Sequence, residues 1–110
     1  MIAARYIVKT GHIVSLEVKG HAQSGTGEYD MLCAAVSAIT QTALLGLKNV
    51  VMADPKYTIR DGYLKIEVDV KDKDKQACAD AVMLTLLEGL KDIAGGYPSM
   101  IKLEEVENVY

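Results

Sequence analysis

The chain has 110 residues, of which half are hydrophobic and a quarter are charged, and its formal net charge is −3. This length predicts a single domain, residues 1–110, with a core of its own. Phe and Trp are absent, so the expected core is mainly aliphatic. A phosphate backbone needs a cluster of Lys and Arg, whereas the positive charges here are scattered. We therefore expect no direct contact with nucleic acid.

The first part of the chain predicts two strands followed by a loop. Residues 2–9 and 13–19 are strand-like, and apolar and polar residues alternate in the second segment. The alternation predicts core-facing side chains at Val14, Leu16 and Val18. A turn is expected at residues 10–12, with an exposed and inert His12. Residues 20–30 contain three glycines and no periodicity, which favours a mobile loop.

Residues 31–53 predict a long helix, because Ala and Leu dominate and Pro55 supplies a stop beyond it. Asp30 is the candidate N-cap. The helix is apolar around most of its circumference, so it is expected to be buried on several sides, either under the sheet or between two copies of the protein. Its uncharged run, residues 31–47, is short for a membrane span, which needs about 20 apolar residues.

The second part of the chain repeats the pattern of strands and helix. Residues 57–60 and 63–70 predict a hairpin around Asp61-Gly62. A helix is expected from residue 73 or 74 to residue 94, and a short strand over residues 100–103. The order ββαββαβ indicates an α+β fold, with a largely antiparallel sheet of about five strands and two helices.

Cys33 and His21 are the residues best placed for chemistry. If Asp30 caps the helix, Cys33 lies in its first turn, where unpaired amides and the helix dipole favour a thiolate. The same amides are candidates to stabilise an oxyanion. His21 ends the second strand and is a candidate general base and acid for the thiol. The arrangement predicts nucleophilic catalysis by a Cys-His pair.

Two further polar residues belong to this candidate site. Asp30 has two competing roles, capping the helix or orienting the imidazole of His21, and we favour the cap. Ser37 lies one turn beyond Cys33 on the same face. Its hydroxyl is expected to bond to His21, to substrate, or back to the Cys33 carbonyl.

Structural explanations compete with the catalytic one. A lone Cys in an Ala-rich helix is more often a core residue, and Cys78 in the second helix is interpreted as purely structural. The two cysteines form no paired motif, so neither a disulfide framework nor a close set of zinc ligands is expected. We expect no metal and no organic cofactor. The chain opens on a strand pattern without a secretory signal, which predicts a cytoplasmic protein.

The segment Gly20-His21-Ala22, followed after a glycine-bearing loop by Asp30-Met31-Leu32-Cys33-Ala34 and then by Ser37, resembles the ribosomal-processing cysteine protease family, Prp. The length and element order of the whole chain resemble it too. Met31-Leu32 stands where that family more often has Ile or Val pairs.

The resemblance implies a dimeric α+β cysteine endopeptidase with His21 and Cys33 as its catalytic pair. Asp30, Ser37 and Gly20 then occupy supporting motif positions, and Gly25 and Gly27 belong to a mobile loop over the substrate. The implied substrate is the N-terminal extension of a large-subunit ribosomal protein, number twenty-seven. An apolar groove beside Cys33, a homodimer and the absence of membrane contact are expected with it.

Two other functions remain open from the sequence. One is a non-catalytic, ribosome-associated interaction module of the same fold, in which Cys33 stays buried and protonated. The other is a redox or thiol-transfer protein that uses Cys33, for which the sequence offers no resolving cysteine nearby.

Overall fold

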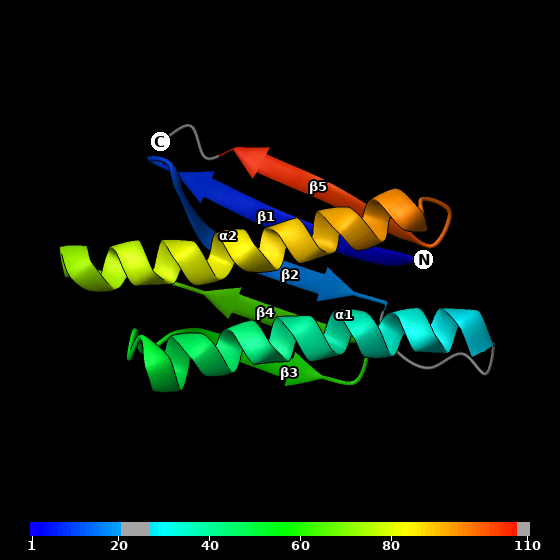
Figure 1. The fold of residues 1–110 in the computed structure, drawn as a ribbon, viewed down its shortest axis with the longest axis horizontal. Helices are drawn as coiled ribbons and strands as arrows, with labels where there is room; N and C mark the ends of the chain where they lie inside the picture. Colours follow the sequence, from blue (N-terminus) through cyan, green and yellow to red (C-terminus); the bar gives the residue numbers. More distant parts are fainter. Residues whose placement is uncertain (21–26, 108–110) are drawn as a thin grey trace.

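The computed structural model describes residues 1–20 and 27–107. Its element order confirms the predicted α+β fold: β1 (Ile2–Lys9), β2 (His12–Lys19), α1 (Gly27–Leu45), η1 (Gly46–Val50), β3 (Lys56–Arg60), β4 (Tyr63–Glu67), α2 (Lys73–Gly96) and β5 (Ile101–Glu107). The strands form one sheet in the order β3-β4-β2-β1-β5. In Figure 1 the two helices lie along one face of this sheet, α2 over β1 and β2, and α1 over β4 and β3. The core fills the space between the two layers.

The sheet is mixed rather than purely antiparallel. The two predicted hairpins are present, since β1 pairs with β2, and β3 with β4, both antiparallel. β5 instead pairs with β1 in parallel, from Ile2 opposite Ile101 to Val8 opposite Glu107. The long α2 crossover makes this possible, because it returns the chain to the same end of the sheet before β5 begins.

The prediction that Val14 faces the core is wrong, because a β-bulge interrupts the pairing of β1 and β2 at this residue. The register of β1 and β2 shifts between Ile7 and Val8, so that Ile7 pairs with Ser15 and Val8 with Ile13. Val14 is therefore the extra residue and is only half-buried, while Ile13 is 6% exposed and takes the core position. A bulge changes the alternation of faces by one residue, and the simple alternation of apolar and polar residues does not reveal it.

Helix α1 begins and ends earlier than predicted. It starts at Gly27 rather than at residue 31, and beyond Leu45 it continues as a π-helical turn, η1, to Val50. Its buried residues lie on one side and face the core: Leu32, Cys33, Val36, Thr40, Ala43 and Leu44. By length and composition the segment Gly27–Val50 could cross a membrane, and within the described chain its buried residues pack into the core. Within one chain it is therefore buried on one side only.

Helix α2 begins as predicted, at Lys73. The carboxylate of Asp72 is its N-cap and accepts hydrogen bonds from two first-turn amides, at 2.9 and 3.0 Å. The helix packs on the sheet through Ala79, Met83, Leu86, Leu87 and Leu90. Cys78 is not part of that face and is exposed, so it does not belong to the core.

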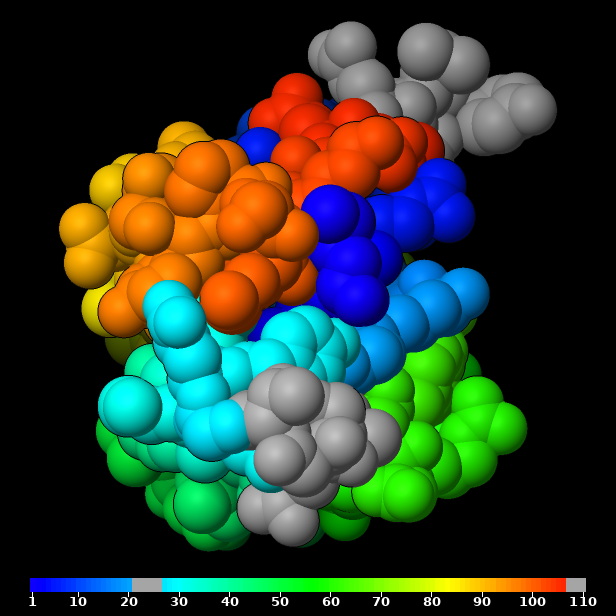
Figure 2. All heavy atoms as spheres, turned by 90° about the vertical axis from the view of Figure 1, so that its right-hand side faces the viewer, coloured from blue at the N-terminus to red at the C-terminus, as the bar shows by residue number. Residues whose placement is uncertain are grey.

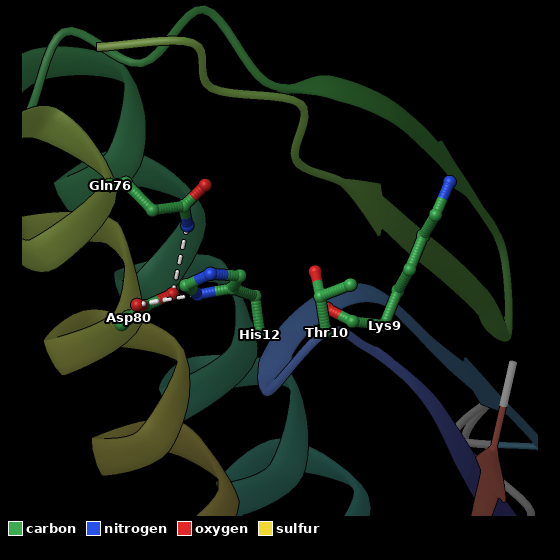
Figure 3. A network of polar contacts seen from close by, with 5 residues as sticks. All are labelled: Lys9, Thr10, His12, Gln76 and Asp80. Atoms are coloured by element: carbon green, nitrogen blue, oxygen red, sulfur yellow. Dashed lines mark hydrogen bonds and ion pairs between the residues drawn. The ribbon is translucent and has the colours of Figure 1, made fainter. Parts of the chain in front are cut away.

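His12 connects the β1–β2 hairpin to helix α2 instead of standing free. Its Nδ1 lies 2.8 Å from Oδ2 of Asp80, and the Gln76 side-chain amide donates to the other oxygen of that carboxylate, also at 2.8 Å. Figure 3 shows the imidazole pointing toward α2, with Lys9 and Thr10 turned away from it. The expectation of an exposed His12 is thus wrong, because it is half-buried and its contact holds the first turns of α2 against the hairpin.

Candidate active site

The candidate nucleophile, Cys33, is deeply placed in helix α1. Its side chain is 2% exposed and belongs to the core cluster. Because the helix starts at Gly27, Asp30 is its fourth residue and Cys33 its seventh. Asp30 is therefore not the N-cap, and the backbone amide of Cys33 lies beyond the four that a helix leaves unpaired. Both predictions based on a helix start at residue 31 are wrong.

The surroundings of Cys33 favour the neutral thiol. Burial is the largest influence and raises the pKa of the thiol, and the negative charge of Asp30 raises it further. A hydrogen bond with Tyr29 acts in the opposite direction and lowers the pKa. The expected helix-start thiolate is thus contradicted for this conformation, and a base must remove the proton before the sulfur becomes a nucleophile.

Gly20 holds the backbone next to this thiol. Its carbonyl oxygen lies 4.0 Å from the Cys33 Sγ. Its φ angle is +82°, and a Cβ atom there would stand 2.5 Å from the Met1 carbonyl oxygen. The Gly20 amide donates to the Gly62 carbonyl at 2.9 Å. Only glycine fits this conformation and this close approach, which explains the glycine at this motif position.

Tyr29 completes the described site and was not singled out from the sequence. Its hydroxyl donates a hydrogen bond of 2.5 Å to the Gly20 carbonyl oxygen and also reaches Cys33. Tyr29 precedes Cys33 by four residues, so both side chains lie on the same face of α1. That spacing was the available signal, but residues 20–30 were interpreted as a loop, in which spacing by four has no such meaning.

The other predicted site residues are only partly described. His21 and Gly25 lie outside the described residues, although His21 directly follows Gly20 in the sequence. Gly27 is the first residue of α1, and so belongs to the helix rather than to a loop. Asp30 is half-buried in the first helical turn and takes part in a polar or electrostatic interaction. Ser37 is half-buried one turn beyond Cys33.

The site lies at one end of the molecule. Figure 2 looks onto that end, where the start of α1 in cyan, the N-terminal residues in dark blue and the end of α2 in orange come together. Among the described residues, no group of three or more His, Cys, Asp and Glu side chains is arranged to hold a metal ion. The functional groups described at this site include the Cys33 thiol, the Tyr29 phenol, the Gly20 carbonyl and the Asp30 carboxylate.

A separate apolar groove runs between the two helices. It has a volume of about 640 Å³ and begins at Ile39, six residues beyond Cys33. Small residues line much of it, among them Ala43, Gly46, Ala81 and Gly89. This groove lies along the outer helical surface, so it is not the groove expected beside Cys33.

Comparisons with known proteins agree on one family. The family model described as the cysteine protease Prp matches residues 1–102. Among solved structures, the SMU.848 protein of Streptococcus mutans is 27% identical, with a TM-score of 0.84 over 98% of this chain and 96% of its own. No curated protein matches the sequence.

Two structures of the essential ribosomal processing protease Prp from S. aureus are also similar. The complex with a substrate peptide is 22% identical, with a TM-score of 0.85, and the complex with a covalently linked product peptide is 24% identical, with a TM-score of 0.82. Each covers 96% of this chain and 100% of its own. At these identities the similarity shows a shared fold.

Proposed function

Because the chain belongs to the family of the cysteine protease Prp, we propose that it removes the N-terminal extension of a large-subunit ribosomal protein, number twenty-seven. The chain is a cysteine protease of that family; the substrate and the catalytic pair are our proposal. One observation supports His21 and Cys33 as the catalytic pair: the Cys33 thiol lies 4.0 Å from the carbonyl of Gly20, the residue directly before His21. The nucleophile thus lies near the residue that precedes the candidate base in the sequence.

In the proposed reaction His21 takes the thiol proton and Cys33 attacks the scissile carbonyl carbon. The new C–S bond gives a tetrahedral oxyanion, which collapses as the C–N bond breaks and the amine leaves with the proton from His21. Water then hydrolyses the thioester and restores the thiol. Because burial raises the pKa of Cys33, the thiol is neutral before this first proton transfer. The S. aureus complex with a covalently linked product peptide supports a covalent intermediate.

The proposed assembly is a cytoplasmic homodimer that contacts neither membrane nor nucleic acid. Helix α1 supports a dimer, since it is buried on one side only and, beyond the acidic first turn with Glu28 and Asp30, its outer surface is uncharged and largely apolar. Exposed large apolar side chains continue along the helical layer: Met31 is 70% exposed, Leu45 54% and Leu84 52%. Analytical ultracentrifugation of the wild type and of Leu45→Lys tests this, and a wild type that sediments as a monomer at micromolar concentration refutes it.

The experiment that tests the function is cleavage of a peptide spanning the extension, followed by mass spectrometry. Wild type and the matched control Cys78→Ser are expected to cut at one bond, because Cys78 is exposed and far from the site in sequence. Cys33→Ala and His21→Ala are expected to bind the peptide without cutting it. Cleavage that survives in folded Cys33→Ala contradicts the proposed nucleophile.

The buried thiol is the observation that favours a non-catalytic peptide-binding module instead. Wild type that binds the peptide and leaves it intact over hours selects that alternative. The redox alternative gains no support, since Cys33 and Cys78 are both free thiols, one buried and one exposed.

A further inference from the structure

The Tyr29 hydroxyl has two hydrogen-bond acceptors within reach, the Gly20 carbonyl oxygen and the Cys33 sulfur. It donates to the Gly20 carbonyl at 2.5 Å and is within hydrogen-bonding reach of the Cys33 thiol. A phenol has one proton to donate, so it can serve only one of these acceptors at a time. Burial raises the pKa of the phenol, and Tyr29 therefore keeps that proton throughout.

The protonation state of Cys33 decides which acceptor is stronger. A neutral thiol is a weak acceptor, so the proton of Tyr29 goes to the carbonyl oxygen, as observed. A thiolate carries a full negative charge, and hydrogen bonds to charged acceptors are roughly twice as strong as neutral ones. The preference of the phenol therefore reverses when the thiol is deprotonated.

We propose that Tyr29 is a hydrogen-bond donor to the nucleophile, whose O–H turns from the Gly20 carbonyl to the Cys33 sulfur when the thiol proton passes to the base. The inference rests on the proposed function, in which His21 is that base. The balance of protons is simple: Cys33 gives one to His21, and Tyr29 keeps its own. The Gly20 carbonyl, whose residue is anchored by the hydrogen bond from its amide to the Gly62 carbonyl, is then left to accept a different hydrogen bond.

The need for such a donor follows from the position of Cys33. Burial and the neighbouring Asp30 carboxylate both disfavour a negative sulfur, and a helix that begins at Gly27 has no unpaired amide at its seventh residue. Among the described side chains, Tyr29 has the largest effect in lowering the pKa of this thiol. The Tyr29 phenol thus stabilises the thiolate in place of the first-turn amides and helix dipole that the sequence predicted for this role.

The test is the pH dependence of Cys33 alkylation by iodoacetamide, followed by mass spectrometry in a Cys78→Ser background. We expect Tyr29→Phe to move the inflection of the rate profile up by about one pH unit, with about tenfold less thiolate at neutral pH, as loss of a hydrogen bond to a charged group predicts. Tyr57→Phe is the matched control and should leave the inflection in place, because Tyr57 lies on β3 and contacts Lys48.

An unchanged inflection in folded Tyr29→Phe overturns the inference. So does a rate that changes by the same factor at every pH, since that result reports access to the thiol rather than its charge. Replacement of Tyr29 by 3-fluorotyrosine provides a second arm that hardly alters packing: its more acidic phenol should move the inflection down. These measurements need no peptide, so a wild type that fails to cleave refutes the proposed function without affecting this result.

Discussion

The Gly20→Ala variant tests whether glycine is required beside Cys33 by steric contact with Met1 as well as by its positive φ angle. The φ angle of +82° alone costs an L-residue about 1–2 kcal/mol. In addition, the new Cβ would lie 2.5 Å from the Met1 carbonyl oxygen. Met1 cannot simply move away, because the next amide, that of Ile2, donates to the Met100 carbonyl at 2.8 Å. Forcing an extra methyl group into such a place costs a further ~1–3 kcal/mol.

Gly11→Ala is the matched control for this variant. Gly11 has a φ of +81°, nearly the same as Gly20, but among the described residues no atom beyond its chain neighbours would lie within 4 Å of an added Cβ. It should therefore show the conformational cost alone, about 1–2 kcal/mol. Urea unfolding monitored by circular dichroism gives the free energy of unfolding for both variants and for wild type.

The difference in free energy of unfolding between Gly20→Ala and Gly11→Ala isolates the effect of the steric contact. We expect Gly20→Ala to be less stable than Gly11→Ala by ~1–3 kcal/mol, and to lose peptide cleavage, since the Gly20 carbonyl must move away from Tyr29 and Cys33. Gly11→Ala should cleave like wild type. Additivity usually holds to within about 0.5 kcal/mol. A smaller difference in unfolding free energy refutes the expected clash between the added Cβ and the Met1 carbonyl oxygen.

Three further predictions concern capping, pH and thiol exposure. Asp72→Ala should lower the free energy of unfolding by about 1 kcal/mol in urea titrations, because helix α2 loses its N-cap; no change would contradict that role. The Tyr63 hydroxyl donates to the Glu17 carboxylate at 2.7 Å and is the main cause of the lowered pKa of that carboxyl. This hydrogen bond therefore stabilises the folded protein above the ordinary Glu pKa, and the stabilisation is lost as the pH falls through the lowered pKa. Tyr63→Phe should thus be less stable than wild type at pH 7, and the gap should close toward pH 3; a gap independent of pH would rule out the linkage. At pH 7 iodoacetamide should modify Cys78 before Cys33, since Cys78 is exposed while burial raises the pKa of Cys33; the reverse order by peptide mapping would contradict the structure.

Local signals predicted most of the fold. The Asp61-Gly62 turn, the alternation of Leu64 and Ile66 and the start of α2 at residue 73 all depend on residues near one another in sequence, and each is present in the structure. The parallel pairing of β1 with β5 depends on a contact between the two ends of the chain, for which no local pattern exists. The bulge at Val14 likewise depends on the partner strand.

The site was predictable to the extent that it depends on residue types. Cys33 and Gly20 were found from their motif, and the structure brings them together. Tyr29 was missed and Asp30 was misassigned for a single reason: glycine suggested a loop, whereas the chain is already helical at Gly27. The spacing of Met83 and Leu87 on the buried face shows that residue 79 faces the core and residue 78 does not.

The parallel β1–β5 pair has a consequence for the growing chain. Strand β1 can pair with β2 as soon as both have been synthesised, but its other edge has no partner until residues 101–107 follow. An unpaired edge with buried-type side chains such as Ile2 and Ala4 is a template for pairing with other chains. Until β5 is in place, the described sheet therefore has an open edge at β1 that can pair with another chain. Truncation before Ile101 would make that open edge permanent.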